Sequence, residues 1–429
     1  MSEQRRRGFA FARLLSSAVV SQGLLSAANF IIGLILIRNT SDEQYGLYVL
    51  VYSAILLLIS LQNAFINPPL AIRITKLDQS GRSELVGGLY REQRRYLPSL
   101  GALVVIVAIV LWYFEILNNY TGPLVLVTVL ATLAILNREY FRMVLFAHRR
   151  PQNVLVTDIL YVVLAISGVY VASFTPAPSV AAVIVLALAA VVSGIFLSRA
   201  LHRIEPWDIK GAKGILREIA PLASWSTAGA AIHWTFSQGY IYLVASTLSI
   251  TAVSIIAATR LLMMPMNLLS TGIRSLMMPL ASSWLHKHGA SLVWRRLILF
   301  ALGLAVMTVF YFAILWFLRD WIFDVVLKKQ FAERDELLLL WGAIILVTVV
   351  RDQLIYLMAA QGRFKTLGLF TLFCAVLALL ASYIGMLQFG VGGALIGMLI
   401  GEVVNLLGIV IFSMRSKQGI NNEPARSTA

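Results

Sequence analysis

Charged side chains inside long apolar runs are the positions of this chain best suited to do chemistry in a binding site. Arg138, Arg260 and Arg351 each lie well inside such a run. A guanidinium in this setting can hold an anionic ligand, or it can form an ion pair with an acid from a neighbouring segment. Both interpretations stay open for Arg138 and Arg260, whereas Asp352 directly after Arg351 favours a local structural ion pair.

Two further arginines lie nearer the ends of their runs. Arg142 shares a helix face with Arg138, and Glu139 is spaced to reach Arg142 one turn away. The position of Arg142 predicts a side chain that anchors at the lipid headgroups. Arg38 closes the first apolar run, where a role in gating and simple termination of the helix both remain open.

Two acids and a histidine are candidates for carrying a coupling ion. Asp158 and Glu402 lie within apolar runs, where burial favours the protonated form of a carboxyl group, so each could carry a proton. His233 is the third candidate, since an imidazole changes its charge near neutral pH. Each acid could equally neutralise one of the arginines, and this alternative stays open.

The residue patterns of common enzyme and metal sites do not occur in the sequence. Cys374 is the one cysteine, so no disulfide can form within the chain and no metal site can rest on cysteine. There is no HExxH, CxxC or GxxxxGK(S/T) pattern. We therefore expect no enzyme activity, no cofactor and no metal ion.

The candidate residues are embedded in a chain whose composition indicates a membrane protein. Of its 429 residues, 59% are hydrophobic and 13% are charged, whereas soluble domains carry roughly 25% charged residues. Runs long enough to cross a bilayer recur along the chain, and they must be helical because backbone groups in lipid bond internally. We expect an all-α fold with about 12 transmembrane helices. The runs are 14–37, 46–67, 97–117, 123–147, 154–174, 180–197, 221–245, 252–278, 297–318, 337–360, 367–387 and 394–414.

The basic residues predict how the chain is oriented. The terminal tails and alternate connections contain 25 lysines and arginines, against 4 in the connections on the other side. By the positive-inside rule both termini are expected in the cytoplasm, with the chain in a bacterial inner membrane. The net charge of +15 then lies along one membrane face, which excludes nucleic acid as a partner.

The second half of the chain repeats the first. Arg138-Glu139 and the segment 145–150 align with Arg351-Asp352 and the segment 358–363. The same offset superposes the fifth apolar run on the eleventh and the sixth on the twelfth. Two six-helix lobes of the same orientation imply a parallel pseudo-repeat, the usual build of an alternating-access transporter. We expect an N-terminal lobe at 1–200, a cytoplasmic linker at 201–219 and a C-terminal lobe at 220–429.

Two short segments resemble a known family. Asn29 followed by residues 38–48, RNTSDEQYGLY, resembles the first external turn of Wzx-type polysaccharide (O-antigen) flippases. These proteins belong to the multidrug/oligosaccharidyl-lipid/polysaccharide exporter superfamily. Residues 257–260, AATR, with Pro265 soon after, resemble the equivalent start of the second lobe. The two-lobed plan extends the resemblance over nearly the whole chain.

The matched turns also predict local structure. Ser41-Asp42 stands where the family usually has Gly-Pro, and Ser41 with Gln44 predicts a capping box that starts the second helix. Pro265 predicts a kink in the helix that carries Arg260.

The resemblance implies a transporter that flips an isoprenoid-diphosphate-linked oligosaccharide from the inner to the outer leaflet, for a surface polysaccharide such as an exopolysaccharide or O-antigen. It implies that Arg260 contacts the cargo diphosphate with help from Arg138, and that Arg38 and Asn29 are further substrate-binding positions. The expected partners are the lipid-linked oligosaccharide, membrane lipids, and polysaccharide polymerase and chain-length proteins.

Three other functions compete with this interpretation. A membrane polymerase or ligase of the same pathway generally needs a sizeable external loop, and the longest expected external segment, 319–336, is short. A multidrug exporter shares the fold, but a cationic drug favours acidic groups, whereas arginines outnumber acids inside the apolar runs of this chain. A lipid II flippase usually has helices beyond 12.

Overall fold

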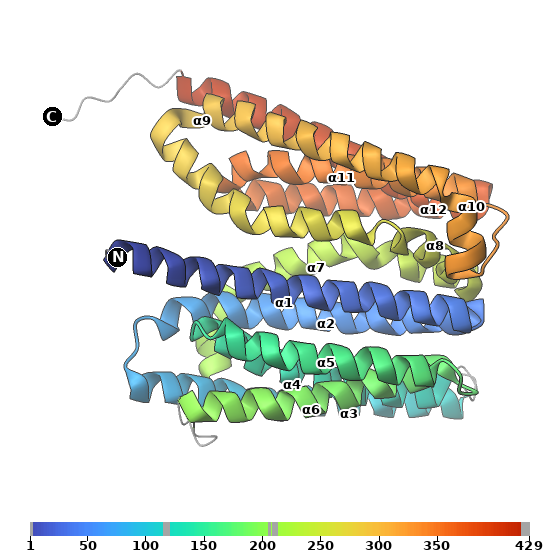
Figure 1. Cartoon of the computed structure of the whole chain (residues 1–429), viewed down its shortest axis with the longest axis horizontal. Helices are drawn as coiled ribbons and strands as arrows, with labels where there is room; N and C mark the ends of the chain where they lie inside the picture. Colours follow the sequence, from blue (N-terminus) through green and yellow to red (C-terminus); the bar gives the residue numbers. More distant parts are fainter. Residues whose placement is uncertain (1–2, 115–120, 205–206, 208–212, 422–429) are drawn as a thin grey trace. The chain divides into compact units, whose positions relative to one another are not determined.

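The computed structural model describes residues 3–114, 121–204, 207 and 213–421 of the chain, and most of them are helical (Figure 1). No strand occurs among these residues, which confirms the all-α prediction. The chain divides into two compact units, Met1–Ala231 and Ile232–Ala429. The boundary falls inside a helix, and each unit has its own buried apolar core.

The first unit is a helical bundle that ends partway along a seventh helix. In this bundle α5 packs against α1 and α6, while α2, α3 and α6 pack against α4 (Figure 1). Its helices are α1 (Glu3–Asn39), α2 (Asp42–Ile74), α3 (Gln79–Tyr113), α4 (Thr121–Ala147), α5 (Pro151–Ala172), α6 (Pro178–Ile204) and the beginning of α7 (Ile215–Thr247).

The second unit is arranged around α11, which packs against α8, α9 and α12. A short π-helix, η1, follows α10 and precedes α11. The elements after α7 are α8 (Ile250–Leu261), α9 (Met264–Phe317), α10 (Arg319–Trp321), η1 (Ile322–Leu327), α11 (Arg334–Ala360) and α12 (Phe364–Asn421).

Several long helices change direction within their length. α9 turns at Gly289 (φ 75°) and α12 turns at Gly390 (φ 56°), and glycine adopts such positive φ values at little steric cost. α8 and the start of α9 meet at a bend of 55°. Pro265 lies in the first turn of α9, so the kink predicted from this proline is confirmed.

The described helices account for about 12 membrane crossings. Nine of them are long and apolar enough to span a bilayer, and the bent pair of α8 with the start of α9 makes a tenth. The turn at Gly390 divides α12 into two segments, and α7 adds a further helix of 33 residues. The predicted span number is thus plausible for this fold.

One predicted connection is largely helical. One apolar run ends at residue 67 and the next begins at residue 97, which predicts a connection at 68–96 that carries six basic residues. In the structure α2 continues to Ile74 through Pro68 and Pro69, and α3 begins at Gln79. Both helices therefore extend beyond the apolar runs, since a helix can continue into water when its residues there are polar.

Ser41 caps the start of α2, as the first half of the predicted capping box requires. Its hydroxyl oxygen accepts a hydrogen bond from the backbone N–H of Gln44 (3.3 Å). The side-chain oxygen of Gln44 accepts hydrogen bonds from the backbone N–H (3.2 Å) and the hydroxyl (2.7 Å) of Ser179. The cap therefore also ties the start of α2 to the start of α6.

The predicted repeat is visible in the backbone. α4 and α11 each contain 27 residues, and each is followed by a residue of positive φ, Arg149 (57°) and Gly362 (73°). In both turns the next backbone N–H donates to a carbonyl at the end of the helix, over 2.9 and 3.1 Å. This is the Schellman arrangement that ends many helices. The offset between the two turns equals the offset between Arg138 and Arg351.

The two segments of α12 pack against each other through small residues. Gly385 lies against Gly393, and Gly397 lies against the backbone of Ser382. The hydroxyl of Ser382 donates to the carbonyl oxygen of Ala394 (2.8 Å). Small residues allow two membrane helices to approach closely, so α12 is a tight helical hairpin.

Candidate functional site

The first unit contains a polar cavity of about 160 Å³. Its wall is formed by α1, α2, α4 and α5, so the cavity lies inside the bundle. Amide, hydroxyl and guanidinium groups line it, together with a smaller number of aliphatic side chains. The polar lining residues include Gln22, Asn29, Tyr52, Asn63, Arg138 and Tyr161.

A cluster of four charged side chains forms one side of this cavity. Arg138 donates to Glu139 (2.7 Å) and to Asp158, and both the arginine and the aspartate are almost fully buried. Arg142 pairs with the same two acids, at 3.4 and 3.1 Å, and its side chain is 12% exposed. Ser21 completes the cluster by donating to Asp158. Two positive and two negative charges balance each other here.

This cluster corrects the interpretation of Arg142 as a headgroup anchor. The guanidinium of Arg142 points into the bundle, where Glu139, Asp158 and Ser21 bind it. The predicted contact between Glu139 and Arg142 is present. For Arg138, the acid in a neighbouring segment is Asp158.

Two buried polar atoms at the cavity have no hydrogen-bond partner among the described residues. They are Nε of Arg138, a donor, and Oδ1 of Asn63, an acceptor. Nearby, the hydroxyl of Tyr52 donates to Oδ1 of Asn29 (2.9 Å), and the guanidinium of Arg138 stacks on the ring of Tyr161 at 4.0 Å. A ligand that offers both a donor and an acceptor would satisfy the two open positions.

The predicted site residues of the first unit are only partly brought together. Asn29 and Arg138 line the same cavity, and Asp158 lies directly behind it, bound to Arg138. Arg38 is exposed in the last turn of α1, nine residues and roughly 13 Å along the helix from Asn29. It does not line this cavity.

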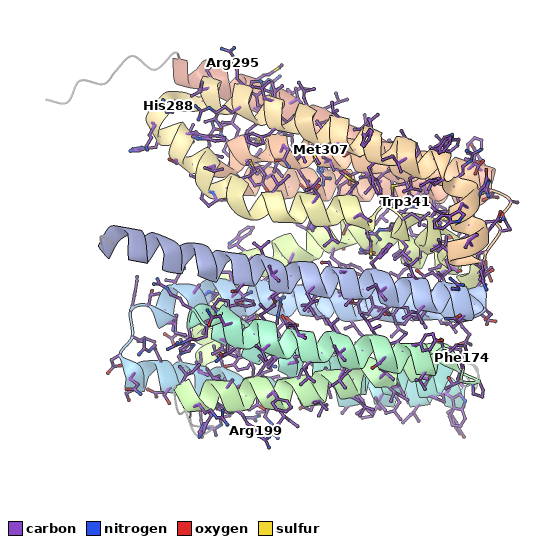
Figure 2. All side chains as sticks on the ribbon, in the orientation of Figure 1. Phe174, Arg199, His288, Arg295, Met307 and Trp341 are labelled. Atoms are coloured by element: carbon purple, nitrogen blue, oxygen red, sulfur yellow. The ribbon has the colours of Figure 1, made fainter. Side chains whose placement is uncertain are left out.

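In the second unit, Arg260 is surrounded by neutral groups. Its Nη1 donates to the side-chain oxygen of Gln238 (2.8 Å) and to the hydroxyl of Tyr240 (3.3 Å). The guanidinium lies 5.5 Å from the ring centre of Trp341, a residue of α11 that is labelled in Figure 2. No carboxylate pairs with Arg260 among the residues that the structure describes. Within the described ranges, its positive charge is therefore not neutralised by an ion pair.

Arg351 of the same unit has acidic partners. It donates to Asp352 (2.8 Å), as the adjacent positions predicted, and also to Glu402 on the second segment of α12. The two halves of the repeat thus differ in which helix supplies the acid that binds the buried arginine. The first unit pairs its buried arginine with Asp158 from α5, whereas the second unit takes Glu402 from the helix equivalent to α6.

The remaining candidate for ion coupling is His233, which lies on α7 and has an exposed side chain. Within the described ranges, no group of three or more His, Cys, Asp or Glu side chains could hold a metal ion. The buried acids Asp158 and Glu402 are both bound by arginine in this structure.

Several neighbours of the arginines are not predicted by the sequence. Tyr161 lies three residues after Asp158, so the helical period places both on one face of α5. Gln238, Tyr240 and Trp341 contact Arg260 from other helices. Contacts between helices cannot be read from spacing along the chain.

Comparison with known proteins identifies the fold. No protein-family model matches the sequence, and no curated protein matches it. Among solved structures, an inward-facing multidrug resistance MATE family transporter of the MOP superfamily is 14% identical, with a TM-score of 0.76 over 96% of this chain and 100% of the other. An outward-facing MATE family transporter is 15% identical, with a TM-score of 0.66 over 97% of each chain.

A third solved structure is a MOP superfamily transporter from Pyrococcus furiosus, whose description reports a binding pocket of reverse polarity that suggests a different function. It is 15% identical, with a TM-score of 0.64 over 96% of each chain. At this level of identity the likeness concerns the fold. The protein is a multi-pass membrane protein with the fold of MATE family transporters.

Proposed function

We propose that this protein is a transporter that flips an isoprenoid-diphosphate-linked oligosaccharide from the inner to the outer leaflet of a bacterial inner membrane. The observation that carries the proposal is the environment of Arg260. This guanidinium lies among Gln238, Tyr240 and Trp341 with no carboxylate partner in the described part of the chain. A charge in a membrane span is costly unless it has a function or a partner, and a guanidinium binds two phosphate oxygens at once.

The polar cavity of the first unit supports the sugar part of the proposal. The open donor on Arg138 and the open acceptor on Asn63 match a hydroxyl group, which can both accept and donate. Asn29 and Tyr52 add further polar groups to the same wall. In the proposed mechanism Arg260 contacts the cargo diphosphate during transit, Arg138 helps at the cytoplasmic side, and Asn29 is a further contact of the cargo.

The fold supports transport by alternating access. Structural neighbours of this chain include one inward-facing and one outward-facing MATE family transporter. In transporters built of repeated halves, such states arise when the halves move about a fixed binding site. The basic residues favour an orientation with both termini in the cytoplasm. We propose polysaccharide polymerase and chain-length proteins as partners that receive the cargo.

A multidrug exporter is the second candidate, because the structural neighbours are described as multidrug resistance transporters. The charges distinguish the two functions. An exporter of cationic drugs benefits from acidic groups that are not neutralised, whereas Asp158 and Glu402 are both bound by arginine. Arg260 instead favours an anionic cargo.

Deletion of the protein tests the proposal. Cells without it should still assemble the lipid-linked oligosaccharide, should accumulate it on the inner leaflet, and should lose the surface polysaccharide. Mass spectrometry of lipid extracts measures the amount of lipid-linked oligosaccharide, and surface staining measures the polysaccharide. The control is complementation with the wild-type chain.

Two results would contradict the proposal. If deletion stops assembly of the lipid-linked unit while the sugar transferases are intact, the protein is an enzyme of assembly. If deletion leaves the surface polysaccharide unchanged and raises sensitivity to cationic drugs, the protein is a drug exporter.

A further inference from the structure

The first unit contains a second cavity, of about 250 Å³, whose lining is almost entirely apolar. It lies between α2, α3 and α4 and is closed at one end by the first turns of α7. Its lining side chains include Leu58, Leu61, Phe65, Leu97, Leu136 and Leu216. The apolar surface of this lining favours contact with a hydrocarbon chain.

The two cavities of this unit border different faces of α2 and α4. On α2, Gln62 lines the apolar cavity and Asn63 lines the polar one. On α4, Leu136 lines the apolar cavity and Arg138 the polar one. Gln62 bridges the two helices by donating to the carbonyl oxygen of Leu136 (2.9 Å). A lipid held in the apolar cavity would therefore lie beside the proposed site for the polar part of the cargo.

The opening of the apolar cavity at α3 is basic. Tyr96 lines the cavity and is 52% exposed, and the guanidinium of Arg95 lies 6.0 Å from its ring centre. Arg94 is exposed on the same turn, and Arg217 is exposed directly after the lining residue Leu216.

The nearby acid is bound elsewhere. The carboxylate of Glu92 accepts hydrogen bonds from the backbone N–H groups of Gly214 and Leu216 (2.7 Å to the latter). These are unpaired donors of the first turn of α7, so Glu92 fixes α7 over the cavity. Glu218, directly after Arg217, is also exposed and forms an ion pair with Arg73 (2.7 Å). With both acids bound, the opening keeps the positive charges of Arg94, Arg95 and Arg217.

We propose that this cavity binds the phosphate-proximal part of an isoprenoid lipid tail from the inner leaflet, with the lipid phosphate on Arg94, Arg95 and Arg217 before the diphosphate passes to Arg260. The inference rests on the proposed function for the choice of an isoprenoid lipid. The branched and aromatic lining suits a branched chain, and the basic opening suits a phosphate. The volume of about 250 Å³ admits the first part of a long tail and leaves the rest in the bilayer.

The test is binding of a sugar-free polyprenyl phosphate to the purified full-length protein in nanodiscs. Leu97→Trp and Leu58→Trp fill the cavity from α3 and from α2, and each should weaken binding by about tenfold. Leu103→Trp is the matched control, because Leu103 is on α3, is 57% exposed and does not line the cavity. It should bind as the wild type does.

The charge at the opening is tested with a second pair of variants. Arg95→Gln should weaken binding of the polyprenyl phosphate by about fivefold, since it removes a charged hydrogen bond. It should leave binding of the uncharged polyprenyl alcohol unchanged. Arg199→Gln is the control, because Arg199 (Figure 2) is an exposed arginine of α6 away from the cavity.

Three outcomes would overturn the inference: wild-type binding by both cavity-filling variants, equal competition by phosphatidylglycerol, and no binding to the wild-type protein. Each can occur while deletion still abolishes surface polysaccharide, which leaves the proposed function intact. Conversely, unchanged polysaccharide after deletion contradicts the proposed function, whatever the binding measurement gives.

Discussion

Arg260 and Arg351 lie in the same unit but differ in the groups around their guanidinium ions. Arg351 binds two carboxylates, whereas Arg260 binds an amide and a phenol and lies against an indole ring. Removing one partner of a buried ion pair leaves a lone charge behind, but removing a charge with neutral partners does not. The two arginines should therefore respond differently to substitution.

For Arg260 we expect a loss of transport without a loss of protein. Arg260→Ala should lower surface-polysaccharide output by about tenfold or more, the cost of a charged hydrogen bond, at near-normal abundance in the membrane. Arg260→Lys should recover part of the output, because lysine supplies the charge but not the fixed fork of donors. Quantitative surface staining and immunoblotting of membranes measure the two effects. Wild-type output from Arg260→Ala at normal abundance would refute a role in cargo binding.

For Arg351 we expect a loss of protein that a second substitution reverses. Arg351→Met leaves Glu402 buried without its partner and should cost about 3–5 kcal/mol of stability. Arg351→Met combined with Glu402→Gln removes the lone charge and should restore most of the abundance. Thermal unfolding of the purified variants in detergent gives the comparison. Equal destabilisation by the single and double variants would mean that the ion pair does not hold α11 to α12.

At this scale the sequence predicted the contacts made within one helix and missed most of those between helices. The pairs Glu139–Arg142 and Arg351–Asp352 follow from spacing along a helix. Asp158 and Glu402 were recognised as possible partners of arginines, but which arginine each binds depends on how α5 and α12 pack. The wrong interpretation of Arg142 has the same cause, because depth in the run does not show whether a side chain faces lipid or protein.

Among the elements, α12 depends on close packing between its two segments. A Cβ atom at Gly397 would collide with the backbone of Ser382. Gly397→Ala should therefore destabilise the second unit by about 1–3 kcal/mol through overpacking. Gly303→Ala on α9 is the control: its Cβ would meet no atom within 4 Å, and alanine favours a helix by about 1 kcal/mol over glycine. Unfolding temperatures of the two variants that shift equally would contradict the close packing.

Helix ends were predictable where a chemical signal marks them. The cap at Ser41 and the bend next to Pro265 follow from residue types with known backbone preferences. The extension of α3 from Gln79 through a polar stretch was not predicted, because hydropathy reports only the part of a helix that lies in lipid. Most helices in the described ranges correspond to one apolar run each, since the length of a span is set by the thickness of the bilayer.

For the whole molecule, the parallel repeat predicts that equivalent turns lie on the same side of the membrane. In a Cys374→Ser background, cysteines at Gln152 and Lys365 mark the turns after α4 and α11. Cysteines at Thr175 and Gln388 mark the turn after α5 and the turn within α12. A membrane-impermeant maleimide added to sealed cells should label the second pair only. Labelling of one member of each pair would contradict the parallel repeat. Labelling of the first pair only would mean that the chain lies in the membrane with the opposite orientation.

The hairpin of α12 also has a consequence for biosynthesis. The second segment of α12 leaves the ribosome after the first segment, and it brings Glu402 to Arg351 and covers the glycine face of the first segment. A nascent chain that stops near Gly390 therefore presents a buried arginine with only Asp352 beside it and an uncovered strip of small residues. Synthesis of the second segment and pairing of Arg351 with Glu402 therefore occur together. We expect a product terminated near Gly390 to expose polar and small-residue surface within the membrane and to be degraded more readily than the longer chain.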